Sequence, residues 1–300
     1  MSRAGHSGDS SGAARPDRAT LIAFVLMAVF GGGNAVAVRF SNFGLPPFWG
    51  AAMRIVTAAL VFWVFVIMRR IALPRGRALR GVILYGLVGT GAAYAFMYWG
   101  FRRITAGLGG AIIALAPLLA LFFAWAHGLE RLRWQGLLGA LIATAGVLFG
   151  VVGGFGNVVH VPSLLALVAG TACLAEAAVV FKLFPPSHPM ATNAVALTTG
   201  APVLLVLSRL AGEPWGLPAT TSTWAAFVYL VLFGSVAVFS LYLYVLSRWT
   251  ASAASYTYLL MPVMAVAIGA WLLSEVVTPS FVIGAALVLV GVWIGAIRGS

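Results

Sequence analysis

Long apolar stretches alternate with short polar breaks along most of the chain. The pattern predicts ten helices, which we place at roughly 19–40, 48–68, 79–99, 104–127, 134–153, 163–184, 190–211, 224–246, 251–273 and 279–297. Each stretch is close to the ~20 residues that an α-helix needs to cross the ~30 Å hydrocarbon core of a bilayer. We therefore expect an all-α integral membrane protein with ten transmembrane helices, embedded in the lipid bilayer and without room for a soluble catalytic domain.

The composition indicates the same class of protein. Of the 300 residues, 62% are hydrophobic and 8% are charged, whereas ~25% are charged in a typical soluble domain. The net charge of +12 comes from arginines in the polar breaks, where we expect contact with anionic lipid head groups and not with nucleic acid. Cys173 is the single cysteine, and His127, His160 and His188 lack metal-ligand spacing. We therefore expect no disulfide within the chain, no metal and no other cofactor.

The distribution of arginine and lysine predicts the orientation in the membrane. With the N-terminus inside, thirteen Arg or Lys residues fall on the cytoplasmic side and four on the outer side. Because such residues are enriched in cytoplasmic connections, both termini are expected in the cytoplasm. Residues 1–18 are polar and rich in Ser, Gly and Arg, so we expect a disordered cytoplasmic tail.

The stretch from 89 to 150 recurs 145 residues later, at 234 to 295, without a gap. Each window holds one Glu, and the two Glu align in the same register as a Pro, an Arg and a Thr. The matching pairs are Gly89 with Gly234, Arg103 with Arg248, Thr105 with Thr250, Pro117 with Pro262, Glu130 with Glu275, Gly139 with Gly284, Gly146 with Gly291, and Gly150 with Gly295. The match of rare residue types indicates a true internal repeat, which sets the fold.

Each copy of the repeat contains five predicted helices, an odd number, so the second copy starts on the opposite side of the membrane. We therefore expect two inverted five-helix halves, 19–153 and 163–297. Such halves are related by a pseudo-two-fold axis in the membrane plane, and the substrate site of these folds lies near the bilayer midplane between the halves.

Short motifs in both copies resemble those of a known family. They are Ala116-Pro117, Gly128-Leu129-Glu130 and Trp134-Gln135-Gly136 in the first copy, and Pro262, Glu275 and Gly284 in the second. The chain resembles the ten-helix members of the drug/metabolite transporter superfamily, which have two EamA-type domains. Its aromatic-rich interior is similar to that of YddG-type exporters of amino acids and metabolites. The resemblance implies an inner (plasma) membrane transporter that moves amino acids or related metabolites outward. Ser274 and Met261 replace the family's usual Gly and Ala, and they leave the substrate open.

Aromatic side chains on three predicted helices are candidates for binding a substrate. Tyr94 and Tyr98 are four residues apart and share a helix face. Phe239 and Tyr242 lie on the equivalent helix of the second copy, and Tyr256 lies on the next helix. A phenol combines an apolar ring with a polar tip, which suits an amphipathic solute. The alternative is that these tyrosines form belts at the membrane interface.

Three backbone features are candidates for kinks or gating. Pro117 and Pro262 are expected in mid-helix, where proline removes a hydrogen bond and bends the helix. The freed carbonyl groups must find partners or face a wet cavity, although such kinks can also serve packing alone. Gly32 lies in a glycine triplet that loosens the first helix. The adjacent Asn34 is a candidate hydrogen-bond donor to the substrate.

The charged residues within or beside the spans have different expected roles. Glu176 lies deep in the span 163–184, where a carboxylate is costly and indicates function, either binding a substrate amine or carrying a proton. Arg54 is only ~10 Å from the outer end of its helix at ~1.5 Å per residue, so we interpret it as a structural side chain that snorkels to the surface. Glu130 and Glu275 are expected to cap the start of the next helix.

Glycines at every fourth position mark the last helix of each half. They are Gly146, Gly150 and Gly154 in the first half, and Gly291, Gly295 and Gly299 in the second. Small residues at this spacing let helix backbones approach closely in membranes. The pattern is compatible with packing inside the protein or with a homodimer through these two helices.

These features favour a secondary transporter that exports small metabolites, in particular aromatic or other apolar amino acids, by alternating access through a central cavity. The sequence has no Walker motif, so transport would use a gradient or be passive. One alternative is an integral-membrane enzyme that acts on a lipid-linked phosphate. Such a site needs clustered His, Asp or Arg, but Asp9 and Asp17 are the only aspartates and both lie in the tail. Another alternative is a flippase for a lipid carrier, which requires a wide lateral opening.

Overall fold

The computed structural model describes residues 17–42, 44–104, 109, 112–131, 133–151, 160–273 and 279–297. These residues form helices joined by short connections, and they contain no β-strand. The protein is therefore an all-α membrane protein, as the spacing of the apolar stretches predicts.

The first half of the chain contributes a series of helices that end at residue 151. They are α1 (Arg18–Asn42), α2 (Pro47–Met68), α3 (Gly76–Tyr85), η1 (Gly86–Ala92), α4 (Ala93–Gly100), α6 (Ala116–Ala126) and α7 (Trp134–Val151). The elements α3, η1 and α4 follow one another without a break and form one rod of 25 residues. η1 is a π-helical segment, in which the backbone is wound more widely than in an α-helix.

The second half repeats this arrangement. Its elements are α8 (Val161–Leu183), α9 (Pro189–Leu210), α10 (Thr221–Val231), η3 (Leu232–Ala237), α11 (Val238–Arg248), α12 (Ala251–Ser255), α13 (Thr257–Leu273), α14 (Pro279–Val292) and η4 (Trp293–Ile297). Here α10, the π-helical η3 and α11 form one continuous rod of 28 residues.

Five rods within the described residues are each long and apolar enough, by length and composition, to cross a membrane. They are Pro47–Met68, Gly76–Gly100, Val161–Leu183, Pro189–Leu210 and Thr221–Arg248. Four of the other predicted spans coincide with α1, α7, the pair α12 and α13, and the pair α14 and η4, whereas α6 covers only the second half of the predicted span 104–127. Most helix boundaries agree with the predicted ones within a few residues, because prolines in the first turn mark several starts.

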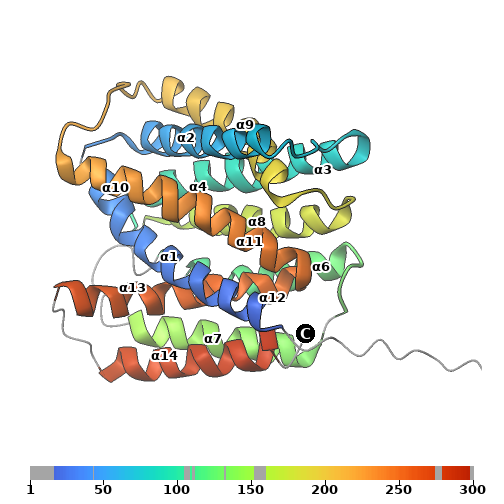
Figure 1. Cartoon of the computed structure of the whole chain (residues 1–300). Coiled ribbons are helices and arrows are strands. Elements are labelled where there is room, and N and C mark those ends of the chain that lie inside the picture. Colours follow the sequence, from blue (N-terminus) through green and yellow to red (C-terminus); the bar gives the residue numbers. More distant parts are fainter. Residues whose placement is uncertain are drawn as a thin grey trace, which may run out of the picture.

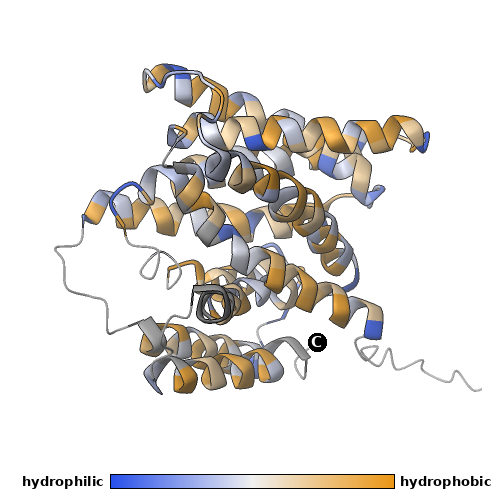
Figure 2. Ribbon diagram, turned by 60° about the vertical axis from the view of Figure 1, so that its left-hand side comes forward, coloured by the Kyte–Doolittle hydropathy of each residue, from blue (hydrophilic) through white to orange (hydrophobic). Residues whose placement is uncertain are grey.

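The helices lie side by side across the bundle and run back and forth between its two ends (Figure 1). α2 and α9 lie at one edge of the bundle, and α7 and α14 lie at the opposite edge. The beginning of α1 and the end of the last helix lie at the same end, as an even number of crossings requires. Figure 2 shows hydrophobic residues along most of the helices and the most hydrophilic ones chiefly at helix ends and connections.

The two π-helical segments η1 and η3 occupy equivalent places in the repeat. A shift by 145 residues carries η1 onto 231–237, and η3 covers Leu232–Ala237. Each segment packs against helices of the other half, η1 against α8 and α9 and η3 against α1 and α2. Because π-helical turns are frequent at functional sites, the region where the two halves meet is a candidate functional site.

Glycine contacts between α7 and α14 show that the halves are inverted. A Cβ placed on Gly139 would lie 2.6 Å from the carbonyl oxygen of Gly291, and one on Gly146 would lie 2.6 Å from that of Gly284. Gly284 is the repeat equivalent of Gly139, and Gly291 is that of Gly146. Each of the two contacts is therefore the repeat equivalent of the other. The helices therefore run antiparallel about a pseudo-two-fold axis, which confirms the inverted repeat.

The same contacts show that the small-residue faces of α7 and α14 pack inside the protein. These faces are occupied by one another, so a homodimer through the same helices would use their outward side chains instead. Those side chains are exposed and apolar, and they include Leu137, Leu141, Phe149, Ile283 and Val290. The homodimer stays a prediction.

The fourth predicted span is not one continuous helix. Ala114 and Leu115 form a turn, and α6 begins directly after them with Pro117 in its first turn. Pro117 therefore lies at a helix start, where its missing N–H costs no hydrogen bond, and not in mid-helix as predicted. The hydroxyl of Thr144 on α7 donates to the carbonyl oxygen of Ala114 at 3.0 Å. The carbonyl group at the break therefore has a hydrogen-bond partner within the protein.

Glu130 caps a helix of the other half. Its carboxylate accepts hydrogen bonds from the backbone N–H of Ser252, at 3.2 Å, and from the Ser252 hydroxyl, at the start of α12. The prediction that Glu130 caps the next helix in the chain is wrong in its target, because folding brings the start of α12 to this carboxylate. Glu275, its counterpart, lies outside the described residues.

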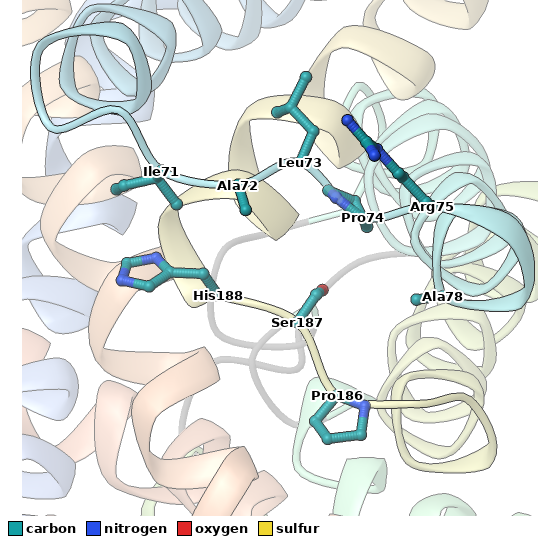
Figure 3. Close-up of a pocket in the computed structure, with 9 residues that line it drawn as sticks. All are labelled: Ile71, Ala72, Leu73, Pro74, Arg75, Ala78, Pro186, Ser187 and His188. Atoms are coloured by element: carbon teal, nitrogen blue, oxygen red, sulfur yellow. The ribbon is translucent and has the colours of Figure 1, made fainter.

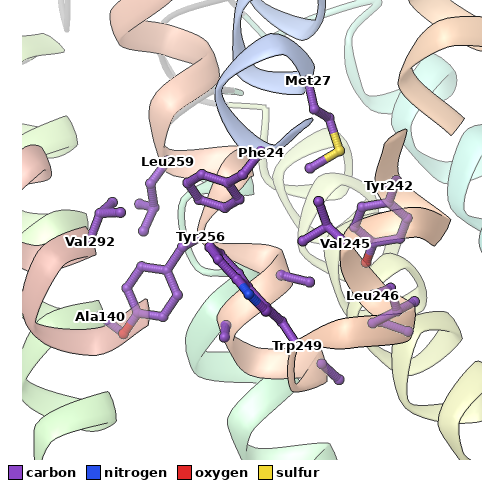
Figure 4. Packing of buried hydrophobic residues seen from close by; sticks show 14 of the residues in the cluster. Phe24, Met27, Ala140, Tyr242, Val245, Leu246, Trp249, Tyr256, Leu259 and Val292 are labelled. Carbon is purple, nitrogen blue, oxygen red and sulfur yellow. The ribbon is translucent and has the colours of Figure 1, made fainter. Parts of the chain in front are cut away.

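A buried cluster of aromatic and aliphatic side chains joins α1, α7, α11, α12 and α13 (Figure 4). The rings of Phe24 and Trp249 have centroids 5.0 Å apart. Tyr256 is 2% exposed, and its hydroxyl donates to the carbonyl oxygen of Gly136 at 2.7 Å. Figure 4 shows its ring directed toward Ala140 of α7. Packing accounts for the burial of Tyr256, whose contact with a substrate stays a prediction.

Candidate substrate site between the two halves

Tyr94, Tyr98 and Phe239 form an aromatic group where α4 meets α11. The rings of Tyr94 and Tyr98 are nearly parallel, with centroids 6.0 Å apart. The rings of Tyr94 and Phe239 lie at 75° to each other, with centroids 6.4 Å apart. The shift by 145 residues carries Tyr94 onto Phe239, so two equivalent residues touch and the pseudo-two-fold axis passes between them. All three side chains are only partly buried. The sequence predicted these residues, and the structure brings them together at the interface of the halves.

Arg54 of α2 reaches into the same region. Its side chain is 4% exposed, with Nε donating to Ser235 Oγ and Nη2 donating to the carbonyl oxygen of Gly234, both at 2.7 Å. Its guanidinium carbon lies 5.9 Å from the centroid of the Tyr94 ring, within the range of a cation–π contact. The snorkelling prediction is therefore wrong, because hydrogen-bond acceptors on η3 draw the side chain inward.

Asn34 of α1 converges on the same carbonyl group. Its Nδ2 donates to the Gly234 oxygen at 3.3 Å, while its Oδ1 is buried and has no hydrogen-bond partner among the described residues. A Cβ on Gly234 would lie 2.0 Å from Asn34 Oδ1, so α1 can approach η3 this closely only because that residue is glycine. Asn34 and Arg54 together place a free acceptor and a cation beside η3.

A second group of tyrosines adjoins the first. The rings of Tyr242 and Tyr258 have centroids 6.0 Å apart, and Tyr258 lies within electrostatic range of both Tyr94 and Tyr85. The Tyr242 hydroxyl is buried beside the hydroxyl of Tyr258. The predicted residue Tyr242 therefore belongs to a chain of phenols, on α3, α4, α11 and α13, that extends from the aromatic group into the bundle.

Glu176 lies apart from the aromatic group and pairs with a histidine. Its Oε1 is 2.9 Å from His127 Nε2, at the end of α6, and the two side chains are 27% and 41% exposed. Glu176 is ~10 Å from the end of α8 at ~1.5 Å per residue, on the side where α1 begins. Sequence reasoning missed this partner, although both residues lie near span ends that face the same side of the membrane.

The remaining gating candidates lie in helix contacts. Pro262 is inside α13, as predicted. The neighbouring Met261 packs directly against Gly31 of α1, since a Cβ on Gly31 would lie 2.4 Å from the methionine Cε. Gly32 is buried, and α1 runs through it without a break. Close packing of α1 on α13 thus accounts for this part of the glycine triplet. A role of Gly32, Pro117 or Pro262 in gating stays a prediction.

The structure also has an open hollow of about 440 Å³ between the α2–α3 and α8–α9 connections (Figure 3). Its lining consists of Ile71, Ala72, Leu73, Pro74, Arg75, Ala78, Pro186, Ser187 and His188. These connections lie at the end of the bundle where α1 begins. The lining includes no member of the aromatic group, so the hollow is separate from it.

Two inverted five-helix halves with aromatic and polar side chains at their junction define a class of protein, an α-helical membrane transporter built from an inverted repeat. More narrowly, the chain belongs to the EamA-like transporter family of the drug/metabolite transporter superfamily. The family model matches twice, at residues 18–152 and 161–296.

Individual relatives agree with this assignment. The chain is 26% identical over 261 residues to the "uncharacterized inner membrane transporter YedA" of Escherichia coli (strain K12), covering 84% of this chain and 82% of that protein. It is 29% identical over 231 residues to a "probable terminal-alkyne amino-acid exporter" of Streptantibioticus cattleyicolor, covering 73% of each. A solved crystal structure covers 95% of this chain and 99% of its own, with a TM-score of 0.80 and 22% identity. That similarity shows the fold.

Proposed function

We propose that this transporter exports amino acids with aromatic or other apolar side chains, and related small metabolites. The observation that carries the proposal is the contact of Tyr94 with Phe239 on the pseudo-two-fold axis, 6.4 Å between centroids, beside the buried guanidinium of Arg54. Aromatic rings there offer an apolar surface to a side chain, and the cation offers a partner to a carboxylate. The name of the Streptantibioticus cattleyicolor relative, a probable exporter of a terminal-alkyne amino acid, supports an amino acid as the substrate.

The proposed mechanism is alternating access. The halves 19–153 and 163–297 would move as units, and inversion lets each half adopt the arrangement of the other, so that the path opens first to one side and then to the other. We propose that the protein resides in the inner membrane with both termini in the cytoplasm. Thirteen Arg or Lys residues on that side against four on the other support this orientation. Fusions of a reporter to each terminus test it.

The experiment for the substrate uses purified protein in liposomes with a panel of labelled amino acids. We expect accelerated exchange of phenylalanine and leucine, and little exchange of lysine or glutamate. A Tyr94→Ala variant should lose most of the activity, whereas a Phe122→Ala variant should not, because Phe122 is 53% exposed on the outside of the bundle. Exchange of no amino acid, together with transfer or hydrolysis of a lipid-linked phosphate, would replace the proposal with the enzyme alternative.

A further inference from the structure

Arg54 carries a buried charge that no described carboxylate neutralises. The four acidic residues that the structure describes bind elsewhere: Asp17 to Thr20, Glu130 to Ser252, Glu176 to His127, and Glu213 to the start of α2. A guanidinium stays protonated in proteins, and a charged side chain inside a membrane protein is costly unless it has a function. The position of Arg54 therefore requires an explanation beyond packing.

The hydrogen bonds of Arg54 leave some N–H groups of its guanidinium available for a ligand. Nε and Nη2 bind Ser235 and Gly234, and a guanidinium has more N–H donors than these two bonds use. Both acceptors are neutral, so the charge itself stays uncompensated. Planar, two-pronged binding of a carboxylate is the interaction for which this group is best suited.

The other half of the repeat shows that the fold does not need an arginine here. α2 and α9 both have 22 residues and begin with proline, and aligning these starts places Arg54 on Ala196. At that position η1 touches α9 directly, since a Cβ on Gly86 would lie 2.3 Å from the Ala196 carbonyl oxygen. A small residue closes this interface in one half, whereas a cation occupies the equivalent interface between α2 and η3.

Asn34 supplies a complementary group next to the cation. Its Nδ2 and the Nη2 of Arg54 both donate to the Gly234 carbonyl oxygen, so the two side chains are neighbours. Its Oδ1 is a buried acceptor without a partner among the described residues. A carboxylate and an adjacent ammonium group would satisfy the cation and the acceptor together.

We propose that Arg54 binds the carboxylate of the transported substrate and that Asn34 Oδ1 accepts a hydrogen bond from its amino group. Tyr94, against which the guanidinium packs, then faces the side chain. The inference rests on the proposed transport of amino acids and assigns the residues that recognise their common part. It makes an α-amino acid the preferred ligand, and compounds that lack either charged group weaker ones.

The test measures binding to the purified full-length protein in phosphatidylcholine nanodiscs, by intrinsic fluorescence and by the melting temperature. The ligands are phenylalanine, phenylalaninamide, phenylethylamine and 3-phenylpropionate. For the wild type we expect phenylalanine to bind about tenfold or more tightly than each analogue, as the loss of a charge-assisted contact predicts. If phenylalaninamide and phenylethylamine bind as well as phenylalanine, or if no carboxylate binds, the inference is overturned, whatever any variant does.

Substitutions then assign the preference to a residue. Arg54→Gln should bind phenylalanine and phenylethylamine equally, and Arg54→Lys should show an intermediate preference, because lysine keeps the charge and loses the fork. Arg102→Gln is the matched control, since Arg102 is exposed in the connection after α4, and it should keep the wild-type preference. If Arg54→Gln does not fold, Arg54→Lys and the ligand series decide the question. An unchanged carboxylate preference in a folded Arg54 variant contradicts the inference.

Competition experiments test whether Arg54 binds another kind of anion. Transport measurements then distinguish a failure of this inference from a failure of the proposed function. Phenylethylphosphonate or inorganic phosphate that competes as strongly as phenylalanine would make this a general anion site and overturn the carboxylate assignment. Competition by phosphatidylglycerol in the nanodisc would assign Arg54 to a lipid head group and also overturn it. Transport of amino acids without an effect of Arg54→Gln on preference leaves the proposed function standing and removes the inference. Arg54-dependent carboxylate binding without amino-acid transport supports the site and removes the proposed function.

Discussion

Tyr94 and Phe239 are equivalent residues of the two inverted halves, and their rings touch at 75° with centroids 6.4 Å apart. A contact between equivalent residues lies on the pseudo-two-fold axis by construction. When the two halves exchange their arrangements, the contact between these two residues must therefore change. Residues far from the axis can move together with their own half.

This relationship predicts the effect of changing the pair. Aromatic contacts of this kind contribute ~0.5–1.5 kcal/mol beyond their buried area, so Tyr94→Leu and Phe239→Leu should each lower the exchange of phenylalanine about two- to tenfold. Tyr94→Phe should retain most activity, because the ring is kept. The double variant should lose less than the product of the single losses, since the two residues share one interaction. Independent, multiplicative losses would mean that the residues do not act as a pair.

The pair of His127 and Glu176, 2.9 Å apart, predicts a pH effect. If Glu176 carries a proton during transport, Glu176→Gln removes the carboxylate that accepts it, and the pH dependence of exchange should flatten. His127→Gln should also change the exchange, because it removes the hydrogen-bond partner of this carboxylate. His188→Gln, at the start of α9, serves as the control. A Glu176→Gln protein with the parent's pH profile would exclude proton coupling through this residue.

The crossing of α7 and α14 predicts a stability effect of the glycines. Gly139→Ala or Gly291→Ala places a Cβ 2.5 Å from a backbone atom of the opposite helix, so the helices must separate. Overpacking of this kind costs ~1–3 kcal/mol, which should appear as a lower melting temperature. Gly216→Ala is the control, since nothing lies within 4 Å of its Cβ. Equal melting temperatures for all three variants would be incompatible with the described crossing.

The hydrogen bond from Thr144 to the Ala114 carbonyl oxygen, 3.0 Å long, also predicts a loss of stability. Thr144→Val keeps the shape and removes the donor, which leaves a buried acceptor unpaired at a cost of ~1–3 kcal/mol. Thr221→Val, at an exposed position in the first turn of α10, should change little. Comparing the two melting temperatures measures what the protein gains by closing the break before Pro117.

The sequence predicts most of the fold because its strongest signals are physical necessities of the bilayer. Runs of ~20 apolar residues and a repeat of five such runs leave little choice of topology. The break before Pro117 escaped prediction because proline is compatible with both a kink and a helix start. Tyr94, Tyr98 and Phe239 could be placed on one interface from helical spacing and the repeat.

Side-chain direction and long-range partners were harder to predict. Arg54 lies near enough to the surface to snorkel, and only the position of η3, 180 residues later, turns it inward. Glu130 could be recognised as a cap but not matched to α12. In both cases the deciding contact joins the two halves, and a sequence pattern local to one helix carries no information about it.

We propose that a solute path lies between the two halves, lined by α4, η3 and α11. Val236, on η3, is partly buried beside the aromatic group. The most direct measurement is the reaction of a Val236→Cys variant, in a Cys173→Ala background, with a membrane-impermeant thiol reagent applied to either side of sealed vesicles. We expect Val236→Cys to react from at least one side, and saturating phenylalanine to slow the reaction, whereas Phe122→Cys on the outside of the bundle should not react. A Val236→Cys protein that reacts from neither side would contradict the path.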